Sequence, residues 1–399
     1  DGSKDKPFRD PFQALEKCQS GDTIHVAEGD YHGKLKVGRW KIELPYIALM
    51  GGYDANFTER APWAHPTRLY CPTEFKGTRG GVTLEGDGDY TGAIVDGFVF
   101  DKRTNNNYDQ DHNLVDQDTD HSIQLRLERP ECAVRNCIFV NGGEGGIQVG
   151  NGMVVENNLF MNHIGAAIVV RGGHTTAPFS LRNNTILFNW ERAGRFGKGM
   201  GFGGEGIIVE SQSRGSIQGN ILEFNDNNAI RFNADPKDVQ LTDNVFAQNL
   251  WSILYRTENI IDDETFGMLG DFGFAASTGN RILTPGIPLD AKWFDLYLKR
   301  TAYVPGKVQM DDWNKVREIL GEPMLATGGE AGSCRAPAYD WKQCLTMVPK
   351  NPECKAGARP SQSAAKFTGI GREEVLHEYA ETPWSTAKRA DTWAALDGQ

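Results

Sequence analysis

The chain has 399 residues, including 46 glycines, with 10% aromatic and 24% charged residues and a formal net charge of −11. This acidity argues against a nucleic-acid-binding protein, because a phosphate backbone attracts a basic face. It also weighs against a polyanionic polysaccharide as ligand, unless a local basic stripe or a bound cation offsets the charge. No stretch approaches the roughly 20 apolar residues of a membrane span, and the aromatic content argues against disorder.

The N-terminal segment contains a recognisable set of residues: Gly2, Ser3, Pro7, Phe8, Ala14, Leu15, residues 21–26, Gly29 and Tyr31. This set resembles the N-terminal cap of the pectate-lyase-like right-handed parallel β-helix superfamily, which includes polysaccharide lyases, epimerases and uncharacterised secreted β-helix proteins. The resemblance implies a short helix and first strands that seal the open end of the core. Because the chain begins inside this motif, we expect residues upstream of Asp1 to be missing.

A second motif resembles a version of the cap that is common in secreted repeat proteins: residues 50–57, Arg60, Pro62, Pro66 and Thr67. The resemblance covers about residues 1–256 and implies a secreted, periplasmic or cell-surface protein. It is specific for the fold rather than for the chemistry, because one fold hosts many activities. No complete catalytic motif of a lyase family is matched, so no catalytic residue is carried over from the resemblance.

Five internal repeats follow. Each begins with a short strand, a polar bend and an apolar stretch that ends in Asn: residues 133–141, 154–162, 180–189, 216–225 and 240–249. A further strand follows in each copy: residues 146–150, 167–171, 206–210, 229–233 and 252–256. Period-two alternation directs one isoleucine per copy into the core: Ile147, Ile168, Ile207, Ile230 and Ile253. The stacked repeats predict an all-β fold, a right-handed parallel β-helix solenoid with an N-terminal cap and a partly helical, irregular C-terminal tail.

The bend of each repeat contributes an asparagine to one column: Asn158, Asn184, Asn220 and Asn244. Stacked amides can hydrogen-bond along the solenoid, and Asn tolerates the left-handed backbone of a bend. We therefore assign these residues a structural role.

Two long insertions interrupt the repeat in the same turn. The first, residues 102–120, follows an earlier coil at residues 93–101 and precedes a strand at residues 121–126; the second spans about residues 190–203. The coils between them have tight turns, so the insertions are expected to wall a groove, and long loops in compact folds are usually functional.

The repeat is no longer visible after Arg256, which divides the chain into a capped β-helix, residues 1–256, and a C-terminal region, residues 257–399. Residues 290–300 and 311–320 read as amphipathic helices, and residues 327–363 as an irregular Cys/Pro/Gly-rich segment. We expect this tail to cover the C-terminal end of the solenoid, because an open last coil exposes a sheet edge. The chain has seven cysteines, and disulfides are plausible among Cys334, Cys344 and Cys354.

An outward column on successive coils is expected to contain Arg126, Gly150, Arg171, Glu210, Asn233 and Arg256. Such a stripe can neutralise the carboxylate of a uronate, which makes its C5 proton acidic enough for a base to remove. The alternative is a salt-bridged ladder, since Glu210 would lie beside Arg171. Both interpretations remain open at this stage.

The turns and insertions supply further candidates. Glu144 lies among glycines, as does Glu205, and is therefore sterically open to a ligand or cation, or else a solvated turn residue; His163 is a turn histidine. The second insertion is basic and could act as a lid over an anionic chain through Arg192, Arg195 and Lys198. The first insertion is acidic and suits Ca²⁺, or is a solvated polar loop, through Asp109, Asp111, Asp116, Asp118 and Asp120.

These features favour a secreted carbohydrate-active protein that acts on an acidic polysaccharide by β-elimination or C5 epimerisation. Arg171 or His163 would be the base or acid and Arg126 the carboxylate clamp, with Ca²⁺ as a possible cofactor. The expected substrate-binding residues are Glu144, Arg192, Arg195, Lys198 and Arg231. The alternative is a non-catalytic adhesin, envelope scaffold or subunit of a larger assembly, with a protein partner.

Overall fold

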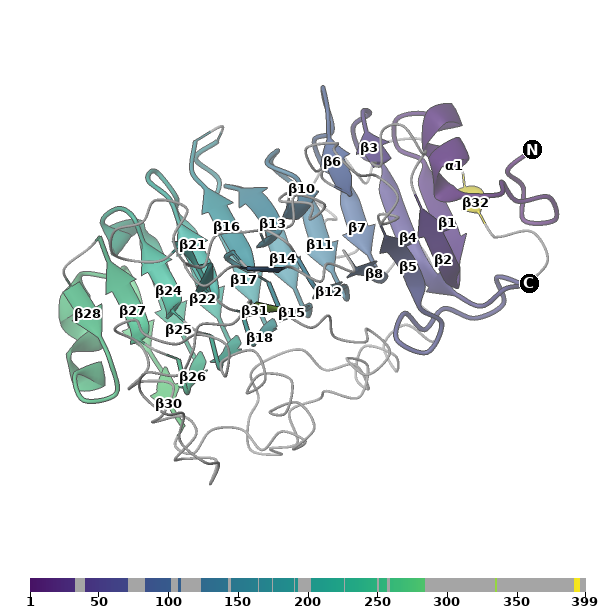
Figure 1. Ribbon diagram of the computed structural model, residues 1–399. Helices are drawn as coiled ribbons and strands as arrows, with labels where there is room; N and C mark the ends of the chain where they lie inside the picture. The colour runs from purple at the N-terminus through teal and green to yellow at the C-terminus, as the bar shows by residue number, and fades with distance from the viewer. Residues whose placement is uncertain are drawn as a thin grey trace.

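The computed structural model describes residues 1–32, 40–70, 83–101, 107–108, 123–142, 145–163, 165–173, 175–189, 191–192, 202–225, 227–249, 251–256, 259–283, 334–335 and 391–394. Over these residues the chain winds through three long sheets that run the length of a solenoid (Figure 1). Neighbouring strands in the three sheets are parallel, except for the last pair of one sheet. The predicted parallel β-helix is confirmed.

Each coil contributes one strand to each sheet. Sheet A contains β1 (Thr23–Ala27), β4 (Ala48–Tyr53), β7 (Ile94–Asp96), β11 (Ala133–Arg135), β14 (Val154–Glu156), β17 (Phe179–Arg182), β22 (Gly215–Gln218), β25 (Val239–Thr242), β29 (Ala276–Thr278) and β32 (Asp391–Ala394). Sheet B contains β2 (Gly29–His32), β5 (Thr67–Tyr70), β8 (Phe98–Asp101), β12 (Ile138–Val140), β15 (Leu159–Met161), β18 (Thr185–Leu187), β23 (Ile221–Glu223), β26 (Val245–Ala247) and β30 (Arg281–Ile282). Sheet C contains β3 (Trp40–Ile42), β6 (Leu84–Gly86), β10 (Ile123–Arg126), β13 (Gly145–Gly150), β16 (Ile168–Arg171), β21 (Ile207–Val209), β24 (Asn228–Phe232), β27 (Trp251–Tyr255) and β28 (Asn259–Ile261).

The remaining elements are short. Helix α1 (Pro11–Lys17) begins at Asp10, whose side chain accepts a hydrogen bond from the backbone N–H of Gln13. This is the capping helix that the N-terminal motif implied. Two antiparallel pairs and two 3₁₀ helices complete the set: β9 (Asn107–Tyr108) with β31 (Cys334–Arg335), β19 (Glu191–Arg192) with β20 (Phe202–Gly203), η1 (Pro236–Asp238) and η2 (Phe266–Phe272).

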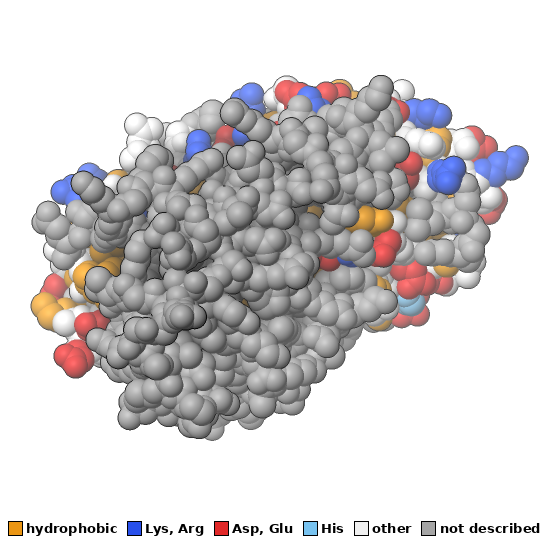
Figure 2. Space-filling view, viewed as in Figure 1, with side chains coloured by type: hydrophobic (Ala, Val, Ile, Leu, Met, Phe, Trp, Pro, Cys, Tyr) orange, Lys and Arg blue, Asp and Glu red, His pale blue; other side chains and the backbone are white. Residues whose placement is uncertain are grey.

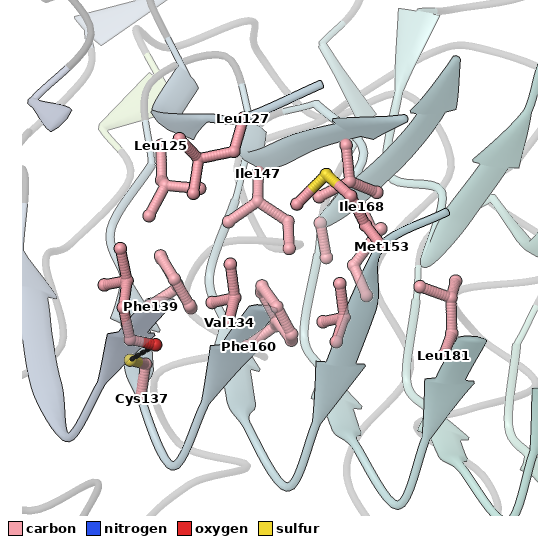
Figure 3. Packing of buried hydrophobic residues seen from close by; sticks show 14 of the residues in the cluster. Leu125, Leu127, Val134, Cys137, Phe139, Ile147, Met153, Phe160, Ile168 and Leu181 are labelled. Carbon is pink, nitrogen blue, oxygen red and sulfur yellow. Dashed lines mark hydrogen bonds between the residues drawn. The ribbon is translucent and has the colours of Figure 1, made fainter. Parts of the chain in front are cut away.

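The core is a continuous stack in which equivalent residues of successive coils lie above one another. The predicted isoleucine column is confirmed by strand pairing and complete burial: Ile147, Ile168, Ile207, Ile230 and Ile253. From sheet B, the rings of Phe100, Phe139 and Phe160 stack with centroids 4.7 and 4.8 Å apart. Figure 3 shows residues of sheet C, such as Ile147, facing residues of sheet B, such as Phe139 and Phe160, across this core. Full burial of an Ile side chain contributes roughly 1.5–3 kcal/mol relative to exposure.

The bend between sheets A and B confirms the predicted asparagine ladder. The backbone N–H and Nδ2 of Asn184 both donate to Oδ1 of Asn220, and the same two contacts link Asn158 to Asn184 and Asn220 to Asn244. The left-handed backbone lies one residue earlier than the ladder, with φ between +53° and +64° at Asn136, Asn157, Asn183, Gly219 and Asp243. The bend therefore separates the strained backbone position from the hydrogen-bonding position.

The parallel pairing continues beyond Arg256. Strands β29 and β30 extend sheets A and B, and Asn280 accepts the next ladder bonds from Asn244. On sheet C, β28 instead pairs antiparallel with β27. One further coil is thus present where the sequence repeat has become invisible, and the division of the chain at residue 256 stays a prediction.

The C-terminal tail reaches the opposite end from the one expected. Strand β32 pairs in parallel with β1 and extends sheet A at its N-terminal edge (Figure 1). The expectation that the tail covers the C-terminal end is therefore wrong for this strand, because the edge that it pairs with belongs to the first coil. The predicted helices and the segment at residues 327–363 lie outside the described residues, except for β31.

The cysteines that the structure describes are not cross-linked. Cys18, Cys132 and Cys137 are free, and burial raises the pKa of Cys132 and Cys137 to about 12. Cys71, Cys344, Cys354 and the side chain of Cys334 lie outside the described residues, so the disulfides expected near the C-terminus stay a prediction. Among the described residues, no helix has the length and apolar character needed to cross a membrane.

Candidate functional site on the outer face of sheet C

The outward column of sheet C differs from the predicted one at Arg126. Arg126 pairs with Gln148, whereas Arg171 pairs with Gly150, two residues further along the strand. Arg126 therefore belongs to the neighbouring column, where it forms an ion pair with Glu85 (2.8 Å). The insertion before β10 hides this shift from a comparison of repeats.

Arg171 is exposed at the end of β16, and the two interpretations of its column can be compared. The structure gives no ion pair between Arg171 and Glu210, which lies on the next coil. Instead Glu210 accepts a hydrogen bond from Nδ2 of Asn233 (3.1 Å). Over the residues that the structure describes here, Arg171 is an exposed cation rather than a rung of a salt-bridged ladder.

This face also contains a buried carboxyl group, that of Glu205. In the sequence, only its glycine neighbours had marked it. Glu205 is 1% exposed, and its Oε1 lies 3.4 Å from Nη1 of Arg231, whose side chain is 21% exposed. Its Oε2 is buried and has no hydrogen-bond partner. Burial raises the pKa of Glu205, although Arg231 and local hydrogen bonds oppose the shift. The result is a carboxyl group that can hold a proton beside a cation.

Asn228 occupies the adjacent coil. The backbone N–H of Gly206 donates to the carbonyl oxygen of Asn228 (3.0 Å), which places Asn228 next to Glu205. Asn228 is 1% exposed, and neither its Oδ1 nor its Nδ2 has a hydrogen-bond partner. Trp251 pairs with Asn228 on the following coil and is partly exposed. The only sequence signal for this cluster was the Gly-Gly-Glu-Gly context at residues 203–206.

His163 does not face the groove. It is fully buried, with Nδ1 2.8 Å from Oδ1 of Asn189 and Nε2 3.0 Å from Oε1 of Gln124. The ring ends a second amide ladder, at the bend between sheets B and C, in which Nδ2 of Asn189 donates to Oδ1 of Asn225. The expectation that His163 is an accessible residue of a groove turn is wrong, because the ring is buried between Asn189 of the next coil and Gln124 of an earlier coil.

The environment of His163 also determines its protonation. Burial lowers its pKa to about 4, so the ring is neutral at pH 7. Gln124 donates from Nε2 to the carbonyl of Phe100, and Asn189 donates to Asn225, so both amides present oxygen atoms to the ring. A neutral imidazole has a single N–H for these two oxygens. Protonation would supply the second N–H, but burial opposes the charge.

The other predicted site residues lie outside the described residues. These are Glu144, Arg195, Lys198 and the acidic insertion with Asp109, Asp111, Asp116, Asp118 and Asp120. Arg192 lies in β19, but its side chain is not described. The two insertions do leave the solenoid at the same corner, between sheets B and C, after β8 and after β18. The Ca²⁺ site and the walled groove stay predictions.

Comparison with known proteins gives one family. The family model described as "Periplasmic copper-binding protein (NosD)" matches residues 75–266, just under half of the chain. No curated protein matches the chain. A periplasmic family agrees with the predicted secreted, periplasmic or cell-surface location.

Several solved structures are similar at low identity. A PL6 alginate lyase in complex with a trisaccharide is 14% identical, with a TM-score of 0.42, over 60% of this chain and 47% of that chain. The tailspike protein of an E. coli bacteriophage is 14% identical, with a TM-score of 0.37, over 67% of this chain and 45% of that chain. An alginate lyase from Paenibacillus sp. is 16% identical, with a TM-score of 0.28, over 63% of this chain and 95% of that chain. This chain spans about half the length of the first two, and the fold rests on the strand pairing described above.

The described residues do not fit the copper in the family description. Within the described part of the chain, no group of three or more His, Cys, Asp and Glu side chains could hold a metal ion. Copper prefers thiolate, thioether and imidazole ligands, but the buried Cys132 and Cys137 thiols stay protonated and donate to the carbonyl oxygens of Tyr90 and Arg135. Both ring nitrogens of His163 already contact amide oxygens.

The capping helix is the feature that the N-terminal motif implied, and the stacked parallel strands and the asparagine ladder are those that the internal repeats predicted. The family model that matches describes periplasmic proteins. The chain therefore has the parallel β-helix fold of the pectate-lyase-like superfamily that its N-terminal motifs resemble, and the description of the matching family model agrees with a secreted or periplasmic protein.

Proposed function

We propose that the protein acts on an acidic polysaccharide by β-elimination or C5 epimerisation at the outer face of sheet C. The observation that supports this proposal is the contact between the buried carboxyl of Glu205 and Arg231, 3.4 Å apart. A carboxyl whose pKa is raised next to a fixed cation is a common arrangement for proton transfer. Arg231 was among the substrate-binding residues expected from the sequence.

The arginines of this face are assigned to the carboxylates of the substrate. An arginine stays charged in proteins, so the exposed Arg171 suits neutralisation of a uronate carboxylate better than removal of a proton. Arg126, whose side chain is 42% exposed, keeps the role of carboxylate clamp that was expected from the sequence, although it also forms an ion pair with Glu85. Neutralising the carboxylate lowers the barrier to losing the C5 proton, because negative charge develops on that group in the transition state.

Glu205 is assigned to proton transfer. In β-elimination, a base takes the C5 proton, the electron pair forms the C4–C5 double bond, the bond from C4 to the glycosidic oxygen breaks, and that oxygen takes a proton. In C5 epimerisation, the proton returns to C5 from the other face. A substrate would approach Glu205 from the side of Arg231, which is partly exposed.

The test uses a panel of pectins, alginates and other uronans. β-Elimination leaves an unsaturated uronate that absorbs in the ultraviolet, and epimerisation is read by NMR of the uronate stereochemistry. We expect wild-type protein to act on at least one of these polymers, and Arg171→Ala or Glu205→Gln to lower the rate more than about a hundredfold. The matched control is Arg182→Ala, which removes a partly exposed arginine of sheet A, paired with Glu156, and should leave the rate unchanged.

A non-catalytic scaffold is the second candidate. It is favoured by the polar groups of sheet C that satisfy one another, such as Arg126 with Glu85 and Asn233 with Glu210. In the face shown in Figure 2, the described acidic and basic side chains are likewise intermixed. A wild-type protein that neither cleaves nor epimerises any polymer of the panel would leave the scaffold as the function.

A further inference from the structure

The start of each sheet C strand forms a column whose residues change character along the solenoid. Gly145 and Ala166 are small, whereas the next three coils place Glu205, Asn228 and Trp251 at the same position. The backbone N–H of Ala167 donates to the carbonyl of Glu205 (3.2 Å), as Gly206 donates to Asn228, so the positions are adjacent. A carboxyl, an amide and an indole therefore follow one another on neighbouring coils.

Three polar side-chain atoms of this column have no hydrogen-bond partner among the residues that the structure describes. Oε2 of Glu205 and both Oδ1 and Nδ2 of Asn228 are buried without a hydrogen bond. Buried polar groups in folded proteins are nearly always hydrogen-bonded, and each exception calls for an explanation. In the asparagine ladders of this chain, by contrast, Asn184 and Asn220 use both amide atoms. Three such atoms on two adjacent coils, without partners in the described part of the chain, point to a polar ligand at this position.

The chemistry of the three side chains defines that partner. Asn228 offers donors and an acceptor, Arg231 next to Glu205 offers a positive charge, and a partly exposed indole such as Trp251 supplies an apolar face for a sugar ring. We propose that Glu205, Asn228 and Trp251 form a subsite for one uronate unit, with Asn228 binding its carboxylate and Trp251 packing against its ring. The inference rests on the proposed function and names the group that orients the acidic sugar.

Binding of short oligosaccharides tests the subsite separately from turnover. The probes are oligogalacturonate and oligomannuronate, with a neutral maltooligosaccharide as comparison, titrated by calorimetry. We expect Asn228→Ala to weaken binding of the acidic probe at least tenfold, and Asn228→Asp to weaken it further by repelling the carboxylate. Gln240→Ala, an exposed amide on sheet A, is the matched control and should bind as wild type does.

Measurements of the unfolding midpoint and of tryptophan fluorescence distinguish a lost contact from misfolding. Asn228→Ala removes two buried atoms without partners, so its unfolding midpoint should stay the same or rise, and a weaker affinity then reports lost contacts rather than misfolding. The acidic probe should also change the tryptophan fluorescence, and Trp251→Phe should abolish that change. If wild type acts on or binds a uronan and Asn228→Ala binds it equally well, the subsite is wrong while the proposed function stands. If wild type neither binds nor converts any uronan, both are wrong.

Discussion

In the coil that contains β7 and β8, charged side chains accept the hydrogen bonds at the bends, whereas in the coils that follow neutral amide side chains accept them. Asp96 accepts from Arg60 (2.7 Å) and from Nδ2 of Asn136, and Asn136 in turn accepts from Asn157. Asp101 ends a parallel chain of amides in the same way, with Arg68 as its cation (2.6 Å). From β14 onwards, the inner ladder between sheets A and B contains only Asn side chains.

This difference follows from the direction of the hydrogen bonds. In the outer chains each amide donates toward the N-terminus, so the first residue must only accept, which suits a carboxylate. In the inner ladder each amide donates toward the C-terminus, and the first group is the backbone N–H of Cys137, which needs no charge. A column of identical amides can continue indefinitely, but its end requires a different residue. The motif at residues 50–67 supplies the arginine that neutralises Asp96.

The largest expected effect comes from removing that arginine. Arg60→Leu leaves the Asp96 carboxylate buried without its cation, at side-chain exposures of 3% and 1% for the pair. We expect the free energy of unfolding, measured by denaturant titration, to fall by about 3–5 kcal/mol. Arg182→Leu breaks a partly exposed pair with Glu156, at side-chain exposures of 37% and 24%, and should cost less than about 1 kcal/mol. Equal losses in the two variants would contradict the contrast between the charged end and the rest of the solenoid.

Breaking a neutral ladder should cost less than breaking the charged end. Asn220→Ala leaves the backbone N–H and Nδ2 of Asn184 without their acceptor and the carbonyl of Leu181 without its donor. We expect a loss of about 3 kcal/mol in the free energy of unfolding, because several buried groups lose partners together. Gln240→Ala, on an exposed face of the next coil, should change the free energy of unfolding by less than about 0.5 kcal/mol. A similar effect of the two substitutions would mean that the ladder does not support the fold.

The smallest of the three effects depends on pH and involves His163. Its pKa is about 4 in the folded protein and about 6.5 in an unfolded chain, so the unfolded state binds the proton first as the pH falls. Stability contributed by the neutral ring is complete above about pH 6.5 and is lost as the pH drops toward 4. Between pH 7 and 5 this loss should be about 2 kcal/mol.

The matched variant for this measurement is His163→Asn, which can continue the amide ladder to Asn189 but does not titrate. Subtracting its pH profile removes the contributions of the other histidines and of the carboxyl groups. A wild-type profile that runs parallel to that of His163→Asn between pH 7 and 5 would show that the ring is not held neutral in the core.

The candidate site was only partly predictable. The sheet, the corner of the two insertions and the exposure of Arg171 follow from period-two alternation and from counting coils. The register of Arg126 could not be predicted in this way, because residues 102–122 separate β10 from β8, the sheet B strand of the same coil. The burial of His163 and Glu205 was not predictable either, since a residue in a turn is covered or exposed according to the residues that the adjacent coils place against it.

The repeated part of this protein follows from local sequence patterns: the inward isoleucine column, the asparagine ladder and the parallel strands that both require. These are local patterns, and each copy restates the same geometry. The positions at which the pattern ends depend on tertiary contacts that no repeat predicts. The extra coil at β29 and β30, the pairing of β32 with β1 and the arginines on Asp96 and Asp101 all join segments remote in sequence or without a visible repeat. An end of a solenoid must satisfy hydrogen bonds that no neighbouring copy supplies, and its partners can come from anywhere in the chain.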